Sequence, residues 1–259
     1  MEKKDLLKDV IKHIDIKSYN STELVDAMRN MSFTSRDTAR AADILMMMCK
    51  EKECTNILTL AGSTSAAGCM QVYVDMVRNK MIDVVVATGA SIIDMDLFEA
   101  LGYKHYIGEK ENVIPDTTLR DLYIDRIYDT YIDEEELQAC DHSTYELANM
   151  LEARPYSSRE FIYEIGKWLH NGKAVKKDSL IQTCYECGVP IFVPAFSDSS
   201  AGFGIGKHQW ERMQKGEKYL SIDSVKDFVE LTQIKMQAPE TGLFMIGGGT
   251  PKNFAQDTV

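Results

Sequence analysis

The sequence lacks the features that define several large classes of protein. No apolar run approaches the roughly 18 residues that a membrane span requires, so we expect no membrane partner. The 29 lysines and arginines are outnumbered by 40 aspartates and glutamates, and the formal net charge of −11 argues against nucleic acid as a partner. The charged first residues, Met1 to Asp5, do not resemble a secretory signal, which predicts a cytoplasmic protein.

Cysteine is scarce and poorly spaced for a metal. Of the six cysteines only Cys184 and Cys187 have the spacing of a ligand pair, and no second pair accompanies them. A zinc site needs four ligands, and a redox pair is favoured at the start of a helix rather than at its end, where these two lie. We therefore interpret both as core residues and expect no bound metal.

Two common sequence signatures are also missing: the chain contains neither the dinucleotide-binding pattern Gly-x-Gly-x-x-Gly nor the catalytic pattern Ser-His-Asp. What the chain does contain is an apolar run at 57–61, typical of a strand buried on both faces, followed by a turn and a helical pattern. The turn consists of Gly62, Ser63, Thr64, Ser65 and Ala66. Such a turn offers backbone N–H groups to an anion such as a pyrophosphate.

Two later stretches repeat this strand-to-turn pattern. One runs from 83 to 90 and ends in Thr88, Gly89 and Ala90, and the other runs from 242 to 251 and contains Gly248. In a parallel sheet such turns converge at the carboxyl ends of the strands, where ligands bind. The alternative is that small residues only pack helices against a sheet. Three such turns favour a ligand site.

The order of the patterns predicts a single α/β domain over 1–259: a Rossmann-like parallel sheet flanked by helices, with a helical N-terminal region over 1–52. Helices are expected over 5–16 and 21–31, from Phe33, from about Ala66, over 96–101 and 178–187, and over 223–237. A capping box of Ser157 and Glu160 predicts the start of another helix, and Gly188 predicts the end of the helix over 178–187. Residues 108–118 and 194–204 read as loops, and 121–137 shows no clear pattern. The methionines at 46–48 are interpreted as core filler.

Four polar residues are candidates for binding a substrate. Asp198 follows a buried strand and is placed to meet a ribose hydroxyl or a cationic amine, although a loop aspartate often bonds only to its own backbone. Asp94 and Asp96 follow the second turn closely, and they either cap the next helix or face the same cleft. His208 is a candidate acid or base, and the alternative for a lone histidine is a structural role.

Four motifs in register resemble the deoxyhypusine synthase family. They are 60–68 with its glycine turn, 83–90, the serine-rich stretch 189–202, and Gly247-Gly248-Gly249-Thr250-Pro251-Lys252. The resemblance runs from about residue 30 to the end of the chain, and it covers the motifs in order and at similar spacing. Four motifs together are far more specific than one glycine turn.

The resemblance implies a parallel-sheet fold that binds NAD between the subunits of a homotetramer. In that family NAD takes a hydride from spermidine, and an aminobutyl group passes to an amine: a lysine of a translation factor, or putrescine in homospermidine synthases. The implied NAD contacts are Gly62 to Ala66, Thr88 to Ala90, Asp198 and Gly248. The residues assigned to the polyamine substrate are Asp94, Asp96, His208 and Asn253, of which Asp94 and Asp96 match the acidic pair of the family only in part and with an offset.

Some positions depart from the family pattern. An acidic residue for the polyamine is replaced by Phe203, and a histidine is replaced by Asn253. The family's catalytic lysine is expected beyond Val259, so the chain is either a fragment or lacks the covalent step. Two hypotheses stay open: an NAD-dependent aminobutyl transferase, preferably with a small diamine as acceptor, or a non-catalytic NAD-binding member that supports an active partner.

Overall fold

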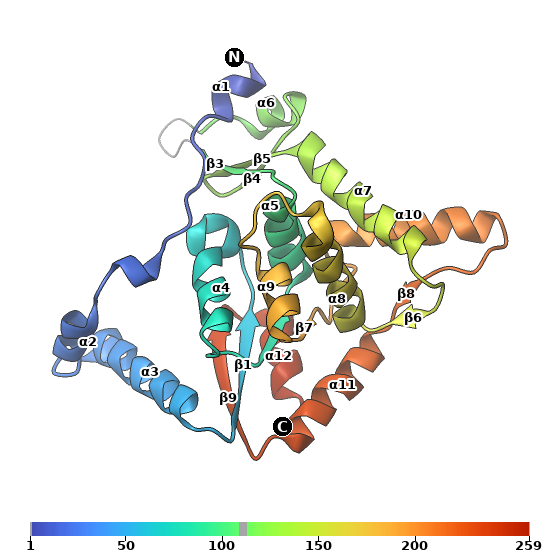
Figure 1. Ribbon diagram of the computed structural model, residues 1–259. Coiled ribbons are helices and arrows are strands. Elements are labelled where there is room, and N and C mark those ends of the chain that lie inside the picture. Colours follow the sequence, from blue (N-terminus) through green and yellow to red (C-terminus); the bar gives the residue numbers. More distant parts are fainter. Residues whose placement is uncertain (1, 109–112, 259) are drawn as a thin grey trace.

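A four-stranded parallel sheet lies at the centre of the computed structural model, which describes residues 2–108 and 113–258 (Figure 1). In spatial order its strands are β7 (Ile191–Phe192), β2 (Val84–Ala87), β1 (Cys54–Leu60) and β9 (Glu240–Ile246). Leu60 at the end of β1 lies opposite both Ala87 and Ile246, so three strands end at the same level. The expected α/β fold with a parallel sheet flanked by helices is confirmed.

Both faces of this sheet are covered by helices, as apolar runs without alternation predict. Leu58 and Val85 face one hydrophobic cluster, whereas Ile57 and Val86 face the other. The helices that contribute to the first cluster include α4 (Met70–Arg78), α8 (Ser158–Trp168) and α9 (Leu180–Cys187). Those that contribute to the second are α11 (Ser224–Gln237) and α12 (Gly249–Gln256). The helix after β1 and the helix after β9 therefore lie on opposite faces.

A smaller antiparallel sheet closes one end of the molecule. Its strands are β3 (His105–Ile107), β5 (Thr130–Asp133) and β4 (Ile124–Ile127). Leu6 of α1 (Lys3–Leu6) and Leu119 of α6 (Asp116–Asp121) share its hydrophobic cluster. From β5 the chain enters α7 (Glu134–Met150), which packs along α10 (Ser200–Gln214) at one side of the molecule (Figure 1). Strands β6 (Pro155–Tyr156) and β8 (Ser221–Ile222) form a short parallel pair.

The expected helix over 5–16 is wrong beyond Leu6. Residues 7–15 form an extended segment, here called the strap, that leads to a short 3₁₀ turn, η1 (Ile16–Ser18). Ile11 N–H donates to the carbonyl of His105, and Ile14 N–H donates to the carbonyl of Gly68. These N–H groups of the strap are hydrogen-bonded to β3 and to the turn before α4, so a helix is not required to satisfy them.

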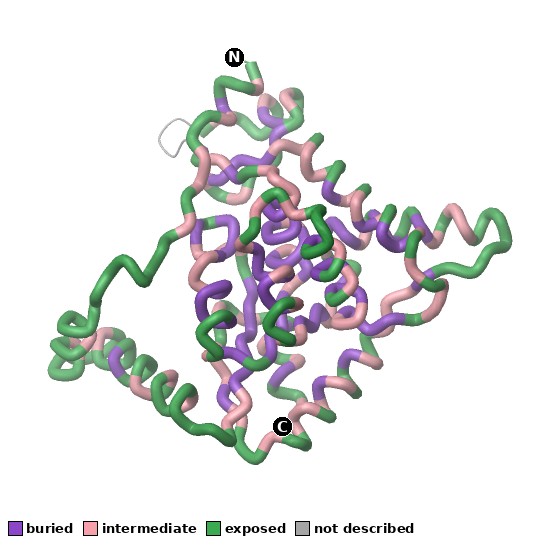
Figure 2. Tube along the Cα trace, viewed as in Figure 1, coloured by how far each residue is buried: buried purple, intermediate pink, exposed green. Residues whose placement is uncertain are grey.

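The two helices expected next are present, but they carry little of the core. Helices α2 (Thr22–Met28) and α3 (Phe33–Lys50) form an arm that stands away from the body and is largely exposed (Figures 1 and 2). Ala39 is the buried residue of α3, whereas Met46 and Met47 are exposed. The interpretation of the methionine run as core filler is therefore wrong for these two residues.

Several local predictions are confirmed and others are corrected. The capping box of Ser157 and Glu160 begins α8, and Gly188 in the left-handed region ends α9. Residues 121–137 contain the β4–β5 hairpin, and the predicted loop over 194–204 gives way to α10 at Ser200. The predicted loop over 108–118 becomes α6 from Asp116, and its residues 109–112 lie outside the described residues.

Irregular helices complete the part of the chain that the structure describes. The chain forms π-type turns at η2 (Ser65–Cys69), η3 (Ala90–Leu97) and η4 (Leu169–Lys173), and η3 continues into α5 (Phe98–Ala100). The helix expected over 96–101 thus begins earlier, at Ala90. Across the described ranges, none of these helices has both the length and the apolar character needed to cross a membrane.

Candidate functional site

The turns after β1, β2 and β9 meet at one edge of the central sheet. The hydroxyl of Ser91 donates to the carbonyl of Gly62 at 3.1 Å, and Ala61 N–H donates to the carbonyl of Ile246 at 2.9 Å. Gly247 adopts a φ of 74° against Ala61, where a side chain would collide with the backbone. Because the connections from β1 and β9 run to opposite faces, the crevice between these strands is a topological switch point, the usual ligand position in such sheets.

The regular helix after β1 begins later than predicted. The chain first forms η2, with Gly68 at a φ of 97°, and α4 begins only at Met70. Met70 N–H donates to Nδ1 of His13 in the strap, at 3.2 Å. The start of α4 is therefore capped by the protein itself, and the candidate anion site is confined to the turn from Gly62 to Ala66.

Within that turn Ser65 has an unusual environment. Its side chain is buried, and its hydroxyl has no hydrogen-bond partner among the described residues. A buried hydroxyl without a partner costs free energy, and a bound acceptor recovers that cost. Next to it, Gly62 is exposed with a φ of 80°, so the backbone is open to close approach. The turn thus fits a phosphate or sugar oxygen of a dinucleotide such as NAD.

Carboxyl groups gather beside the second turn. Asp94 of η3, Asp141 of α7 and Asp198 of the loop after β7 surround the start of α10, and Ser200 N–H donates to Oδ1 of Asp94 at 2.9 Å. Gly89 packs against Ser199 so closely that a side chain at that position would collide with it. We call Asp94, Asp141 and Asp198 with Ser200 the acidic cluster.

Burial controls the ionisation of this cluster. It raises the pKa of Asp94 to about 7, an effect that the hydrogen bonds from Ser200 oppose and the neighbouring carboxylates Asp141 and Asp198 reinforce. Burial likewise raises the pKa of Asp141 to about 6. A cation placed here would favour the ionised carboxylates, so the cluster suits an ammonium group.

Asp96 lies only two residues beyond Asp94, but it serves a different purpose. It is fully buried and accepts hydrogen bonds from the N–H groups of Leu180 and Ile181, both at 2.8 Å. Burial raises its pKa to about 6. Asp96 therefore caps α9, which is not the next helix along the chain. Asp94 accepts the N–H of Ser200 at the start of α10 and also faces the cluster.

The remaining candidates lie outside the cluster. His208 is buried between α7 and the segment before β8: its Nδ1 contacts the side-chain oxygen of Asn149 at 2.9 Å, and its Nε2 accepts Leu220 N–H at 3.0 Å. Burial lowers its pKa. Both ring nitrogens are thus occupied, which favours the structural alternative. Asn253 is exposed on α12 and also lies outside the cluster, whereas Asp198 is the exposed member of the cluster.

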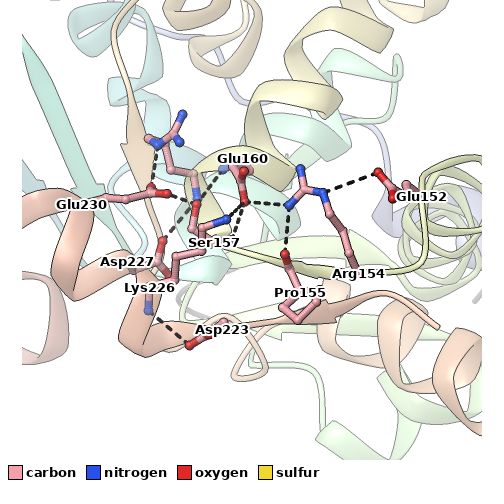
Figure 3. A network of polar contacts seen from close by, with 10 residues as sticks. Glu152, Arg154, Pro155, Ser157, Glu160, Asp223, Lys226, Asp227 and Glu230 are labelled. Carbon is pink, nitrogen blue, oxygen red and sulfur yellow. Dashed lines mark hydrogen bonds and ion pairs between the residues drawn. The ribbon is translucent and has the colours of Figure 1, made fainter. Parts of the chain in front are cut away.

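A polar network joins the start of α8 to α11, close to the end of β7, from which the loop to Asp198 departs. Figure 3 shows its contacts between Ser157 and Glu230 and between Glu160 and Lys226. Val193 N–H donates to the hydroxyl of Ser158 at 2.7 Å, and Arg159 N–H donates to Asp227 at 3.3 Å. Burial opposes the ionisation of Glu160, but hydrogen bonds from Lys226 and Arg154 lower its pKa to about 2. The network thereby holds the start of α8 against α11.

Asp141 and Ser200 were not among the predicted site residues. Asp141 lies on α7, whose sequence carries no site-like motif and follows a stretch without clear periodicity. Ser200 was read as part of a loop, although Ser200 is the first residue of α10. Only the small residues around it, in the stretch 197–202, indicated a site.

Comparison with known proteins shows the family to which this chain is related. Residues 23–259 match the family model described as deoxyhypusine synthase. The chain belongs to the deoxyhypusine synthase family. A deoxyhypusine synthase-like protein of Caulobacter vibrioides is 64% identical over 100% of this chain and 70% of its own length. One from Coxiella burnetii is 59% identical, over 99% of this chain and 72% of its own length.

More distant members of the deoxyhypusine synthase family extend the comparison. "Probable deoxyhypusine synthase 2" of Methanosarcina acetivorans is 39% identical over 95% of this chain and 68% of its own length. A solved structure from Entamoeba histolytica, assigned as a deoxyhypusine synthase, has 21% identity and a TM-score of 0.65, covering 92% of this chain and 79% of that one. At that identity the match supports the fold alone.

Proposed function

We propose that this chain supplies the NAD and polyamine sites of an aminobutyl transferase of the deoxyhypusine synthase type. The observation that carries the proposal is the placement of the acidic cluster next to a dinucleotide-type crevice. Gly89 of the second turn packs against Ser199, which lies between Asp198 and Ser200 of the cluster. A hydride transfer needs its donor carbon beside the nicotinamide and out of water. A polyamine held at the acidic cluster would lie beside a nicotinamide bound in the crevice.

Each group of residues in the site has a role that follows from its chemistry. The turn from Gly62 to Ala66 would hold the pyrophosphate or ribose oxygens, with the hydroxyl of Ser65 as donor. Asp94 and Asp141 would hold an ammonium group of spermidine. NAD, when bound, supplies an acceptor for the hydride of the polyamine carbon next to nitrogen and returns that hydride later. Asp198, exposed at the rim, would meet a ribose hydroxyl or a second ammonium.

A substitution at Ser65 tests whether the turn from Gly62 to Ala66 binds NAD. Ser65→Ala should weaken NAD binding about tenfold, because a hydrogen bond to a buried partner is worth about 1–2 kcal/mol. Without NAD the same change should leave stability unchanged or slightly higher, since the hydroxyl has no partner to lose. Calorimetric titration of NAD measures the first effect. Ser143→Ala on α7 is the control, because the Ser143 hydroxyl donates to the carbonyl of Ala139 in its own helix. Equal NAD affinity in the wild type and Ser65→Ala would remove the turn from the site.

Product analysis tests whether the protein transfers an aminobutyl group. Incubation of the intact protein with NAD, spermidine and putrescine should give a new polyamine detectable by mass spectrometry. Modification of a protein lysine in place of putrescine would indicate a translation factor as acceptor. Tight NAD binding without any transferred group would instead support the second hypothesis, a non-catalytic member that assists an active partner.

We further propose that the protein assembles with copies of itself, as a homotetramer or a smaller symmetric oligomer. The supporting observation is a row of residues along the outer side of α10. Phe203, Trp210 and Met213 are 76%, 64% and 55% exposed, and Gly206 between them leaves open space. An apolar row of this kind is typical of an interface, and two-fold symmetry is the commonest way to cover it.

A further inference from the structure

The strap is bound to η2, the irregular helix that begins with Ser65 of the candidate anion site. Ile14 N–H donates to the carbonyl of Gly68 at 2.9 Å. Gly68 has a φ of 97°, and a side chain at this position would collide with the carbonyl of Lys12. Figure 1 shows the strap passing the start of α4 on its way from α1 to the arm. The close packing of the strap on η2 therefore depends on glycine at position 68.

His13 joins the strap to two further parts of the molecule. Because Met70 N–H donates to Nδ1 at 3.2 Å, this nitrogen carries no proton, and Nε2 is the donor in the contact with Oε2 of Glu99 at 2.6 Å. Glu99 is itself held by Lys176 at 2.5 Å and by Nδ1 of His105 at 2.9 Å. The imidazole ring of His13 is 14% exposed. Its orientation is thus fixed by a buried carboxylate on one side and by the start of α4 on the other.

Two hydrogen bonds connect the start of α4 with the turn after β1. Ala67 N–H donates to the carbonyl of Ser63, and Cys69 N–H donates to the carbonyl of Thr64, both at 3.0 Å. Cys69 is the residue directly before α4, so a displacement of the first turn of α4 also displaces these carbonyl groups. Ser65, whose buried hydroxyl has no partner among the described residues, lies between the donors and the acceptors. A site that is ordered before its ligand arrives loses less free energy on binding.

We propose that His13 is a positioning residue for the cofactor, because its contact with Met70 holds the turn from Gly62 to Ala66 in the shape that binds NAD. The inference rests on the proposed function for the identity of the ligand. The strap lies outside residues 23–259, which match the family model. If the bound strap strengthens NAD binding, bound NAD stabilises the strap by the same factor, because such coupling is reciprocal.

Two substitutions separate the contacts of His13. The side-chain oxygen of asparagine can replace Nδ1, so His13→Asn keeps the acceptor for Met70 N–H and loses the donor to Glu99. The side-chain nitrogen of glutamine can replace Nε2, so His13→Gln keeps the donor and loses the acceptor. In calorimetric titration, NAD should bind His13→Gln about fivefold or more weakly than the wild type, and His13→Asn within about twofold of it. If His13 only stabilised the fold, both folded variants would bind NAD as the wild type does.

His170→Gln is the matched control for these titrations. His170 also pairs with a glutamate, Glu186, at 3.0 Å, but it lies on η4, which packs against α8 and α9 rather than against the turn. The NAD affinity of this variant should equal that of the wild type. Circular dichroism shows whether each variant is folded.

Amide hydrogen exchange provides a second test, which needs no substitution. Saturation of the wild type with NAD should slow the exchange of the Ile11 and Ile14 N–H groups by about the factor that His13→Gln loses in affinity, and leave α2 unchanged. Strap exchange that does not respond to NAD, or equal NAD affinity in both His13 variants, would overturn the positioning role. Faster exchange of η2 in His13→Gln than in His13→Asn, in a protein that binds no NAD, would support the control of the turn by His13 and overturn the proposed function.

Discussion

At the scale of single residues, Asp94 and Asp96 show why a motif does not define a site. They are two positions apart in one π-helix, so their side chains point in different directions. Asp96 accepts hydrogen bonds from two N–H groups at the start of α9, whereas Asp94 accepts one at the start of α10 and also faces other carboxyl groups. The sequence could place both beside the second turn. It could not assign the two roles, because α9 lies more than eighty positions further along the chain.

The raised pKa of Asp94 predicts a pH dependence of amine binding. An ammonium group prefers the ionised carboxylate, so the affinity for spermidine should rise as the pH increases through about 7 and level off above it. Asp94→Asn should bind spermidine weakly and without this rise. Titrations between about pH 6 and pH 8 measure both curves. A wild-type affinity that does not change over this range would mean that Asp94 does not contact the amine.

The same pKa has a consequence for stability, with a definite sign. Between its ordinary value of 3.8 and about 7, Asp94 keeps its proton in the folded protein but loses it in the unfolded chain. Its contribution therefore weakens the fold as the pH rises through that window, and Asp94→Asn should make the unfolding temperature less dependent on pH. Glu160, with its lowered pKa, acts in the opposite sense and only at acid pH, since its stabilising effect is lost as the pH falls through about 2.

At the scale of elements, the strap shows where prediction from periodicity fails. Its residues allow an amphipathic helix, but its backbone is bound to β3 and to Gly68. His13 then makes two contacts that no local pattern reveals, with Met70 N–H and with Oε2 of Glu99 at 2.6 Å. Burial opposes the ionisation of Glu99, but hydrogen bonds from His105 and His13 outweigh it and lower the pKa of this carboxyl group.

Removal of His13 should therefore weaken the whole fold. His13→Ala deletes the cap on α4 and one donor to the buried Glu99, and we expect the free energy of unfolding to fall by about 1–2 kcal/mol. Urea denaturation measures the change. His142→Ala, at an exposed position on α7, should have almost no effect and serves as the comparison. If the two variants proved equally stable, the strap would not be an integral part of the fold.

Elements with strong local signals were predictable, and those fixed by distant contacts were not. The buried strands β1 and β2, the capping box of α8 and the glycine stop of α9 all follow from neighbouring residues. By contrast, the hairpin of β4 and β5 has mixed polarity, and α10 begins within a serine- and glycine-rich stretch typical of loops. The turns of the crevice could thus be anticipated, whereas the position of Asp141 beside them could not.

At the scale of the whole molecule, two surfaces would be left uncovered in a monomer: the exposed arm (Figure 2) and the α10 row. Trp210→Glu places a charge in the α10 row and should shift the protein toward monomer in sedimentation at micromolar concentration. Met236→Glu on α11 is the matched control, because Met236 is 80% exposed but lies outside the row. An unchanged sedimentation coefficient for Trp210→Glu would exclude α10 as the interface.

The central claim is that the crevice and the acidic cluster form one site for NAD and a polyamine. The most direct test is the appearance of reduced nicotinamide absorbance when spermidine is added to the intact protein with NAD bound. The wild type should produce this absorbance, and Asp94→Asn should produce little of it while still binding NAD. If Asp94→Asn reduced NAD as fully as the wild type, the polyamine would not lie at the acidic cluster, and the claim would be wrong.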